Sequence, residues 1–276
     1  MKREQAFRHR LQTLEALHEA VGAMRSLSAH HFRLARKALP AAREYRKATE
    51  SIVAEVGIRP PLHVDGATGL LVVASDLGLC GDYNTRISEL AVSEANQFHA
   101  ATIYSVGRRA RAVLQRHGFV PERVYDSPAS LSGLPQLLLE LAQNILDDYS
   151  ERRIHTLRVV SAAFEGVGHF QPLSIQVLPI DPVTSMPPLP PSPYVDADHL
   201  VASAIREFLY ITLYEVLLDA VAAEHGMRLM AAESAMEWLE NTSSTTARRL
   251  AGVRSEASTQ ELLDIVAGGR RIDEDP

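Results

Sequence analysis

The spacing of hydrophobic residues divides the chain into three parts with different patterns. Residues 4–56 contain one proline, Pro40, and one glycine, Gly22, which predicts one long helix with a bend or a stop near Pro40. Apolar or small residues recur there in steps of three and four, the spacing of a two-stranded coiled coil: Leu14, Leu17, Val21, Met24, Ser28, His31, Ala35 and Ala38. Because this repeat begins with Leu and Val and ends with Ser, His and Ala, it predicts a slim helix that binds its partner weakly.

Short apolar runs separated by helical segments form the second pattern, over residues 60–198. Residues 68–75 are apolar and bounded by a glycine, as is typical of a strand buried on both faces. Further strands are predicted at 102–106, 120–125, 155–164 and 170–178, with helices at 82–100, 108–117 and 134–149. This alternation predicts a compact α/β domain with a mainly parallel sheet. The seven prolines of residues 179–193 predict an extended surface connection.

A second long helix is predicted from residue 199 to about 267, where glycine occurs only at Gly226 and Gly252 and proline does not occur. Its repeat has the same steps: Val201, Ile205, Phe208, Thr212, Val216, Ala220, Ala223, Met227, Met230 and Ser234. A helix of ~65 residues reaches about 100 Å, so its second half must leave the α/β domain. We expect it to pack antiparallel on the N-terminal helix as a projecting stalk. The hydroxyl run at residues 242–246 weakens the helix prediction locally.

The expected organisation is therefore an N-terminal coiled-coil helix (1–57), an α/β domain (60–198), a C-terminal coiled-coil helix (199–268) and a tail (269–276). Composition narrows the class of protein. A hydrophobic content of 46% is ordinary for a folded soluble chain, and the single cysteine, Cys80, excludes an internal disulfide and a thiolate-rich metal site. Because no run of about 18 uncharged apolar residues occurs and the first residues lack the features of a signal peptide, we expect a cytosolic chain, held to a membrane only by other proteins.

Charge is distributed unevenly along the chain. Residues 1–50 hold eleven Lys and Arg and five Glu, a net charge of +6, so the rest carries −12 within the total of −6. A basic segment on an acidic body is compatible with nucleic acid, anionic lipid or an acidic protein surface as partner. The sequence pI near 6.0 weighs against nucleic acid.

The turn expected at residues 75–84 is the richest motif in polar and glycine residues. A glycine-rich turn between strand and helix can bind phosphate, but this one lacks the Gly-Lys-Ser/Thr end of a P-loop and the dinucleotide fingerprint. Cys80 could be a nucleophile, since a helix N-terminus lowers a thiol pKa. The favoured interpretation is a structural turn with Asp82 or Asn84 as the N-cap of the next helix. His30, His31 and the other histidines lack metal-ligand spacing and are interpreted as ordinary helix residues.

This turn resembles the signature of the gamma subunit of F-type ATP synthases in seven residues: Ser75, Asp76, Gly78, Leu79, Cys80, Gly81 and Asn84. Residues 23–25 and 33–35 resemble the first helix of that family, and Glu224 with residues 228–231 resembles its long second helix. Arg254 followed by residues 259–266 resembles its C-terminal segment. The chain departs from the family at Arg25, Ser255 and residues 82–83, which indicates a divergent branch such as an alternative or sodium-translocating F-type ATPase.

The resemblance implies an α/β domain that carries an antiparallel coiled coil and serves as a central rotor stalk. Such a stalk couples ion flow through a membrane ring of c subunits to ATP synthesis or hydrolysis in a hexamer of alpha and beta subunits. The implied partners are the alpha, beta and epsilon subunits and the c ring, at the cytoplasmic face of the bacterial inner membrane. No catalytic residue, cofactor, metal or nucleic acid is expected in this chain, and the membrane is met only through partners.

By the same resemblance, partner contacts fall on both helices and at the end of the proline-rich connection. The expected contact residues are Met24, Arg25, Arg33, Arg36, Arg254, Thr259 and Glu261 on the helices, and Tyr194, Asp196 and Asp198 toward the membrane ring. Two other functions stay open at this point. One is a coiled-coil scaffold or nucleic-acid-binding protein with a basic N-terminal helix, and the other is an enzyme that depends on Cys80.

Overall fold

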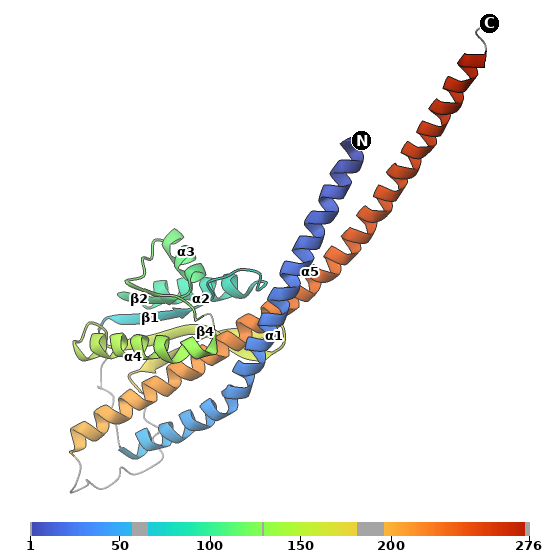
Figure 1. Cartoon of the computed structure of the whole chain (residues 1–276). Helices are drawn as coiled ribbons and strands as arrows, with labels where there is room; N and C mark the ends of the chain where they lie inside the picture. Colours follow the sequence, from blue (N-terminus) through green and yellow to red (C-terminus); the bar gives the residue numbers. More distant parts are fainter. Residues whose placement is uncertain (1, 57–65, 129, 181–195, 274–276) are drawn as a thin grey trace. The chain divides into compact units, whose positions relative to one another are not determined.

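A computed structural model describes residues 2–56, 66–128, 130–180 and 196–273 (Figure 1). The chain divides into two compact units, one of Met1–Ser26 with Ala232–Pro276 and one of Leu27–Ala231. The elements in chain order are α1 (Lys2–Val56), β1 (Thr68–Val73), α2 (Tyr83–Gln97), β2 (Thr102–Val106), α3 (Arg108–Arg116), β3 (Arg123–Tyr125), the 3-10 helix η1 (Leu131–Gly133), α4 (Leu134–Ser150), β4 (Thr156–Gly166), β5 (His169–Leu178) and α5 (Ala197–Asp273).

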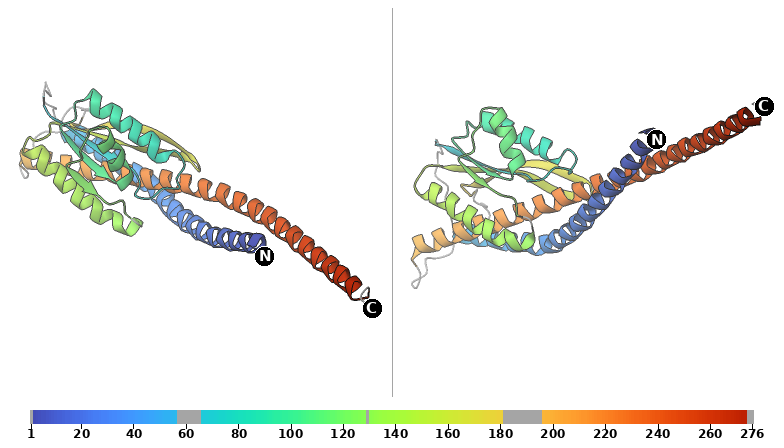
Figure 2. Two further views of the ribbon diagram at one scale, coloured as in Figure 1. Left: turned by 90° about the horizontal axis from the view of Figure 1, so that it is seen from above. Right: turned by 45° about the horizontal axis from the view of Figure 1, so that its top comes forward.

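One five-stranded sheet, in the order β3-β2-β1-β4-β5, forms the centre of the unit Leu27–Ala231. The first four strands are parallel, and β5 pairs antiparallel with β4. The chain moves outward from β1 through α2 and α3, then returns through α4 to β4 on the other side of β1. Because parallel crossovers are right-handed, this reversal places α2 and α3 on one face and α4 on the other (Figure 2).

Two apolar cores, one on each face of the sheet, stabilise this unit. Alternate residues of β1 divide between them, with Leu71 and Val73 in one core and Leu70 and Val72 in the other. The first core also contains α4 and the buried faces of α1 and α5 within this unit, and the second contains α2 and α3. Gly107 links β2 to α3 at φ 92°, where a Cβ atom would lie 2.3 Å from the carbonyl oxygen of Ala74. Only glycine fits this conformation and this approach.

Within the same unit α1 and α5 run antiparallel and are joined by ion pairs. Arg43 contacts Asp219 at 2.8 Å, and Arg46 contacts Glu215 at 2.6 Å. Both carboxylates are nearly enclosed, while the arginine side chains are partly exposed. Burial raises the pKa of Asp219, and the nearby Arg43 opposes that rise. The basic surplus of the first fifty residues is thus partly neutralised by α5.

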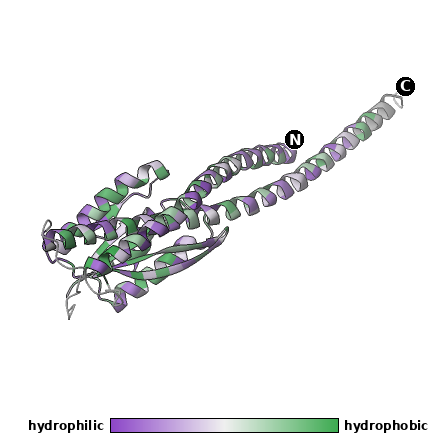
Figure 3. Ribbon diagram, turned by 90° about the horizontal axis from the view of Figure 1, so that it is seen from below, coloured by the Kyte–Doolittle hydropathy of each residue, from purple (hydrophilic) through white to green (hydrophobic). Residues whose placement is uncertain are grey.

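In the unit formed by the two chain ends, α1 and α5 also pair antiparallel. Arg254 contacts Glu4 at 2.9 Å, and His18 lies 3.4 Å from Glu240. Five described residues of this unit are buried: Leu14, Ala232, Leu239, Thr246 and Leu250. An open gap of about 390 Å³ lies beside Leu14 and Leu239, between side chains of the two helices. Hydrophilic residues (purple) and hydrophobic residues (green) alternate along both helices in Figure 3, which is consistent with a narrow buried face on each helix.

Most predicted elements are confirmed, and the mainly parallel α/β sheet is among them. The strand predicted at 120–125 begins only at Arg123, because Val120 is 73% exposed and lies outside the sheet. Residues 181–193 of the predicted proline-rich connection lie outside the described residues. The α1 helix continues through Pro40 without a stop. The hydroxyl run remains helical, and within it the Thr246 hydroxyl donates to the Thr242 carbonyl at 2.8 Å.

Three predicted seam positions are wrong. Leu17 is 47% exposed, and His18 takes its place in the seam of α1. On α5, Met230 is 44% exposed and Ser234 is also exposed, whereas Ala232 is fully buried. The physical reason is the choice of helix face, because two faces of α1 satisfy the same steps of three and four. The partly buried Phe7 and Leu11 precede Leu14 in steps of four and three, and the next step of four leads to His18.

No helix among the described residues combines the length and the apolar character that crossing a membrane requires.

Candidate functional site

The turn between β1 and α2 lies at the topological switch point of the sheet. The chain leaves β1 in one direction and later enters β4 on the opposite side, so the carboxyl ends of these neighbouring strands flank a crevice. In open α/β sheets this crevice is the usual place for a ligand. The residues that the sequence singled out, from Ser75 to Asn84, occupy this position.

Side chains within the turn bond mainly to one another. The Asn84 amide accepts a hydrogen bond from the Ser75 backbone N–H at 3.1 Å and donates to Cys80 Sγ at 3.0 Å. The Ser75 hydroxyl donates to the Leu77 carbonyl at 2.6 Å. Asn84 therefore braces the turn instead of capping α2. Asp82 occupies the N-cap position but makes no side-chain capping bond, so neither residue caps α2 as expected.

Asp76 connects the turn to the neighbouring strand ends. Its carboxylate accepts hydrogen bonds from the backbone N–H groups of Arg108, at 2.8 Å, and Ser127, at 3.2 Å. These residues follow β2 and β3, so one carboxylate joins the carboxyl ends of three adjacent strands. Leu79 and Gly81 both have φ 59°, which is unusual for a leucine. The signature residues thus build a rigid loop.

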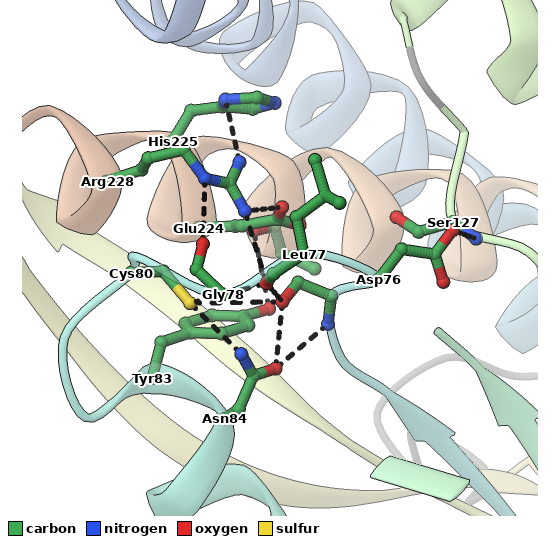
Figure 4. A network of polar contacts seen from close by, with 12 residues as sticks. Asp76, Leu77, Gly78, Cys80, Tyr83, Asn84, Ser127, Glu224, His225 and Arg228 are labelled. Atoms are coloured by element: carbon green, nitrogen blue, oxygen red, sulfur yellow. Dashed lines mark hydrogen bonds and ion pairs between the residues drawn. The ribbon is translucent and has the colours of Figure 1, made fainter. Parts of the chain in front are cut away.

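Helix α5 covers this loop through Arg228 (Figure 4). The Arg228 guanidinium donates to the Gly78 carbonyl at 3.3 Å and to the Glu224 carboxylate at 2.6 Å. Arg228 is 4% exposed and Glu224 8% exposed, so this is a buried ion pair. Burial raises the pKa of Glu224 although Arg228 acts in the opposite direction. The crevice that would admit a ligand in an α/β enzyme is therefore filled by a helix of the same chain.

Two histidines extend this cluster toward α1. The imidazoles of His31 and His225 lie 4.9 Å apart, centroid to centroid, with an angle of 32° between their planes. His225 Nδ1 is 3.4 Å from the Arg228 guanidinium. Burial, reinforced by Arg228 and His31, lowers the pKa of His225 to about 3. Burial also lowers the pKa of His31, so the surroundings of both rings favour the neutral form.

The thiol of Cys80 has the opposite properties to an activated nucleophile. Cys80 is 1% exposed, and burial raises the pKa of its thiol despite the nearby helix N-terminus. A nucleophilic cysteine at this position would need a lowered thiol pKa. The expectation that Cys80 has such a pKa is therefore wrong. Within the described part of the chain, no three His, Cys, Asp or Glu side chains are grouped as a metal site requires.

The contact residues expected on α1 and α5 are not gathered in one place. Arg25, Arg33 and Arg36 are exposed along α1, and Met24 is half-buried. On α5, Thr259 and Glu261 are exposed, and the Thr259 hydroxyl donates to the Ser255 carbonyl of its own helix. Arg254 is engaged by Glu4. Their contacts with partners stay predictions.

At the start of α5, Asp196 has a local role. Its carboxylate accepts the His199 backbone N–H at 3.1 Å, so it stabilises the first turn of α5. Asp198 is exposed in that first turn. Tyr194 lies outside the described residues.

The closing role of Arg228 with Glu224, and the pairing of His31 with His225, were not predicted. A signal was present for the first pair, since Glu224 and Arg228 stand four apart in an otherwise apolar stretch and so share a helix face. The histidine pair had no such signal, because its members are 194 positions apart.

The fold is thus that of α/β proteins that carry two paired terminal helices, one of which covers the crevice at the switch point. A model of the ATP synthase family matches residues 3–270. The chain belongs to this family, to its gamma chains.

Curated relatives are similar over nearly their whole length. The ATP synthase gamma chain of Desulforamulus reducens is 24% identical over 282 residues, covering 96% of this chain and 98% of the relative. That of Thiobacillus denitrificans is 25% identical, with 96% and 98% covered.

Solved structures share the fold. A chain of the Euglena gracilis mitochondrial ATP synthase, from a structure described as OSCP/F1/c-ring, matches with a TM-score of 0.69 and 13% identity, covering 98% of this chain and 95% of that one. A chain of the Tetrahymena thermophila enzyme, described as central stalk/c-ring, has a TM-score of 0.61 and 16% identity, covering 78% and 99%.

Proposed function

We propose that this chain is the central-stalk rotor of an F-type ATP synthase. It couples ion flow through a membrane ring of c subunits to ATP synthesis or hydrolysis in an alpha–beta hexamer. Membership of the gamma family over residues 3–270 carries this proposal. The similar solved chains come from ATP synthase assemblies described as central stalk/c-ring and F1/c-ring, which supports the same role.

The paired chain ends have the physical properties that a rotor needs inside a ring of subunits. With helices about 10–12 Å in diameter, the pair Met1–Ser26 with Ala232–Pro276 is slender. Its few buried residues include the small Ala232 and Thr246, which keeps the seam narrow. Under this proposal, residues 1–57 and 199–268 form the stalk, residues 60–198 the head that meets the c ring and epsilon subunit, and 269–276 the tail.

The end of α5 supports a bearing role within the hexamer. Glu4 pairs with Arg254, and His18 pairs with Glu240. Residues of α1 and α5 that face each other in this unit therefore have residue numbers that add up to about 258. By that pairing no described residue of α1 faces α5 beyond about residue 256, and Leu262, Leu263 and Ile265 there are 58–69% exposed. A soluble chain rarely leaves three such residues together without an apolar surface to receive them.

Charge gives the stalk a way to act on each catalytic subunit in turn. Arg25, Arg33 and Arg36 are exposed along α1 and form no ion pair with a described residue. An ion pair with acidic loops of the hexamer needs to contribute only about 1–3 kcal/mol to bias a subunit. The complex sits at the cytoplasmic face of the bacterial inner membrane, and this chain reaches the membrane through its partners.

Truncation tests this proposal. A chain that ends at Gly252 lacks the single-helix end of α5 but retains all of Leu27–Ala231. In the complete complex, reconstituted in vesicles, we expect ATP hydrolysis to lose its coupling to ion pumping, with the circular dichroism of the isolated chain close to that of wild type. A chain ending at Ile272 is the control and should pump normally.

Two results would contradict the proposal. One is normal ion pumping by the complex with the chain ending at Gly252. The other is failure of the full-length chain to co-purify with alpha and beta subunits expressed beside it.

A further inference from the structure

The histidine pair between α1 and α5 has an environment that tolerates no added charge. His31 is 6% exposed, and its Nδ1 atom is inaccessible and has no hydrogen-bond partner within the described residues. His225 presents its ring at 4.9 Å from the His31 ring and its Nδ1 atom to Arg228. An unpartnered buried nitrogen is costly, so this contact is a poor way to gain stability alone.

Titratable groups around the pair come from α1, from α5 and from the segment that joins β1 to α2. α1 contributes His30, whose ring lies 5.5 Å from that of His31. α5 contributes Glu224 and Arg228, whose opposite charges compensate each other at 2.6 Å. The turn after β1 contributes Asp76 and Cys80, and the first residue of α2 is Tyr83; these titratable groups lie near Arg228 and Glu224. Because Glu224 is already engaged by Arg228, a proton on either imidazole has no free carboxylate beside it among the residues that the structure describes.

We propose that His31 and His225 form a pH-sensitive contact that holds α1 and α5 over the turn at residues 75–84 when both rings are neutral and releases them when either ring is protonated. Protonation of His225 converts Nδ1 from an acceptor into a donor that faces the N–H groups of Arg228. The displaced guanidinium then loses the carbonyl oxygens of Gly78 and Leu77, which hold α5 to the turn. This inference does not rest on the rotor function.

The direction of the pH dependence follows from linkage. Burial first, then Arg228 and His31, lower the pKa of His225 to about 3. Burial first, then His30 and Arg228, lower the pKa of His31. In an opened state both rings would regain a pKa of about 6.5. Protons therefore bind the opened state more strongly, so the contact is fully stable above pH ~6.5 and weakens as the pH falls toward 3.

Cys80 provides a local measurement of this opening. It is the only cysteine of the chain, it is buried beneath Arg228, and it becomes accessible to a thiol reagent only when the turn is uncovered. We would measure the rate of its reaction with 4,4′-dithiodipyridine in the full-length chain at pH 7.5 and pH 5. The same rates for the His31→Gln/His225→Gln double variant correct for the pH dependence of the reagent and the thiol.

We expect the ratio of the wild-type rate to the double-variant rate to rise about 30-fold from pH 7.5 to pH 5. This factor is for one ring whose pKa is about 3 in the closed state and about 6.5 in the opened state. His117→Gln removes an exposed histidine at the end of α3 and should retain the wild-type ratio. A ratio that stays constant with pH would overturn the proposal, as would an equal change in the His117→Gln control.

A second measurement needs no variant and covers the case in which the double variant does not fold. Two-dimensional NMR of the imidazole nitrogens follows the protonation of each histidine in the wild-type chain. We expect the His31 and His225 rings to remain neutral at pH 5, because burial lowers the pKa of both imidazoles. Titration of all eleven histidines in the ordinary range would refute the proposal.

Discussion

The amide of Asn84 bonds to the first residue of the turn after β1 and to the buried thiol near its end. It therefore satisfies a backbone donor and a sulfur atom that α5 and α2 shield from water. At the scale of single residues, the signature of this turn is best explained as internal bracing. Asp76 acts similarly toward the ends of β2 and β3.

Replacing Asn84 with alanine tests this bracing role. Because the Ser75 N–H would lose its acceptor in a partly buried site, we expect Asn84→Ala to lower the free energy of unfolding by about 1–3 kcal/mol. Chemical denaturation measures the change. Asn96→Ala is the matched control on the same helix, since the Asn96 amide is exposed and bonds only to the Val92 carbonyl. Equal losses in the two variants would argue against bracing by Asn84.

Sequence reasoning located this turn but not its bonding. Glycines and short polar residues after an apolar run were enough to predict a strand, a turn and a helix start. Whether Asn84 caps α2 or reaches back to Ser75 depends on the path of the turn, including Leu79 at φ 59°. The contact with Arg228 joins positions 150 residues apart, which no local pattern reports.

At the scale of elements, strands buried on both faces were the most predictable. β1 and β2 appear in the sequence as short apolar runs because both faces of a parallel sheet are covered. β3 was less predictable, since its three residues pair only with β2 at the sheet edge. The seam of α1 was mispredicted at Leu17 because hydrophobicity alone chose between two phases that satisfy the same repeat.

Pro40 lies inside α1, where it removes one backbone hydrogen bond yet does not end the helix. Leu39 and Ala42 beside it are buried against the sheet unit, and these contacts maintain the helix. Pro40 itself is exposed. Tertiary packing thus overrides a local preference that costs up to about 3 kcal/mol.

We therefore expect Pro40→Ala to raise the free energy of unfolding, by about 1–3 kcal/mol, because alanine restores the missing N–H without changing a buried contact. The denaturation midpoint measures this gain. Ala41→Gly changes the exposed neighbouring position and should lower the free energy of unfolding by about 1 kcal/mol. That loss would show that helix propensity matters at this point of α1. A lower midpoint for Pro40→Ala would mean that the proline ring contributes to packing.

At the scale of the whole molecule, the two units differ in how much they bury. The unit Leu27–Ala231 contains both apolar cores, whereas five described residues are buried in the unit of the chain ends. The two long helices were predictable because proline and glycine are rare in both segments. Their division between a well-packed and a sparsely packed unit was not, because it depends on what each segment packs against.

Native-state hydrogen exchange should separate the two units. We expect amides of residues 2–26 and 232–273 to exchange at lower opening free energies than those of β1, β2 and α4, because few buried contacts oppose fraying. Mass spectrometry of peptides from each region measures this. Equal protection across both units would show that the helix ends unfold only together with the sheet.

The gap of about 390 Å³ beside Leu14 and Leu239 has a mechanical consequence. Where an open space lies between two helices, fewer side-chain contacts oppose sliding or winding of one helix past the other. Near Arg43 and Asp219, by contrast, a short ion pair and the buried residues of the first core together hold the two helices. The region around the gap will therefore deform elastically under load before the clamped region does, so that a turning force applied to this chain would be stored there as reversible torsion.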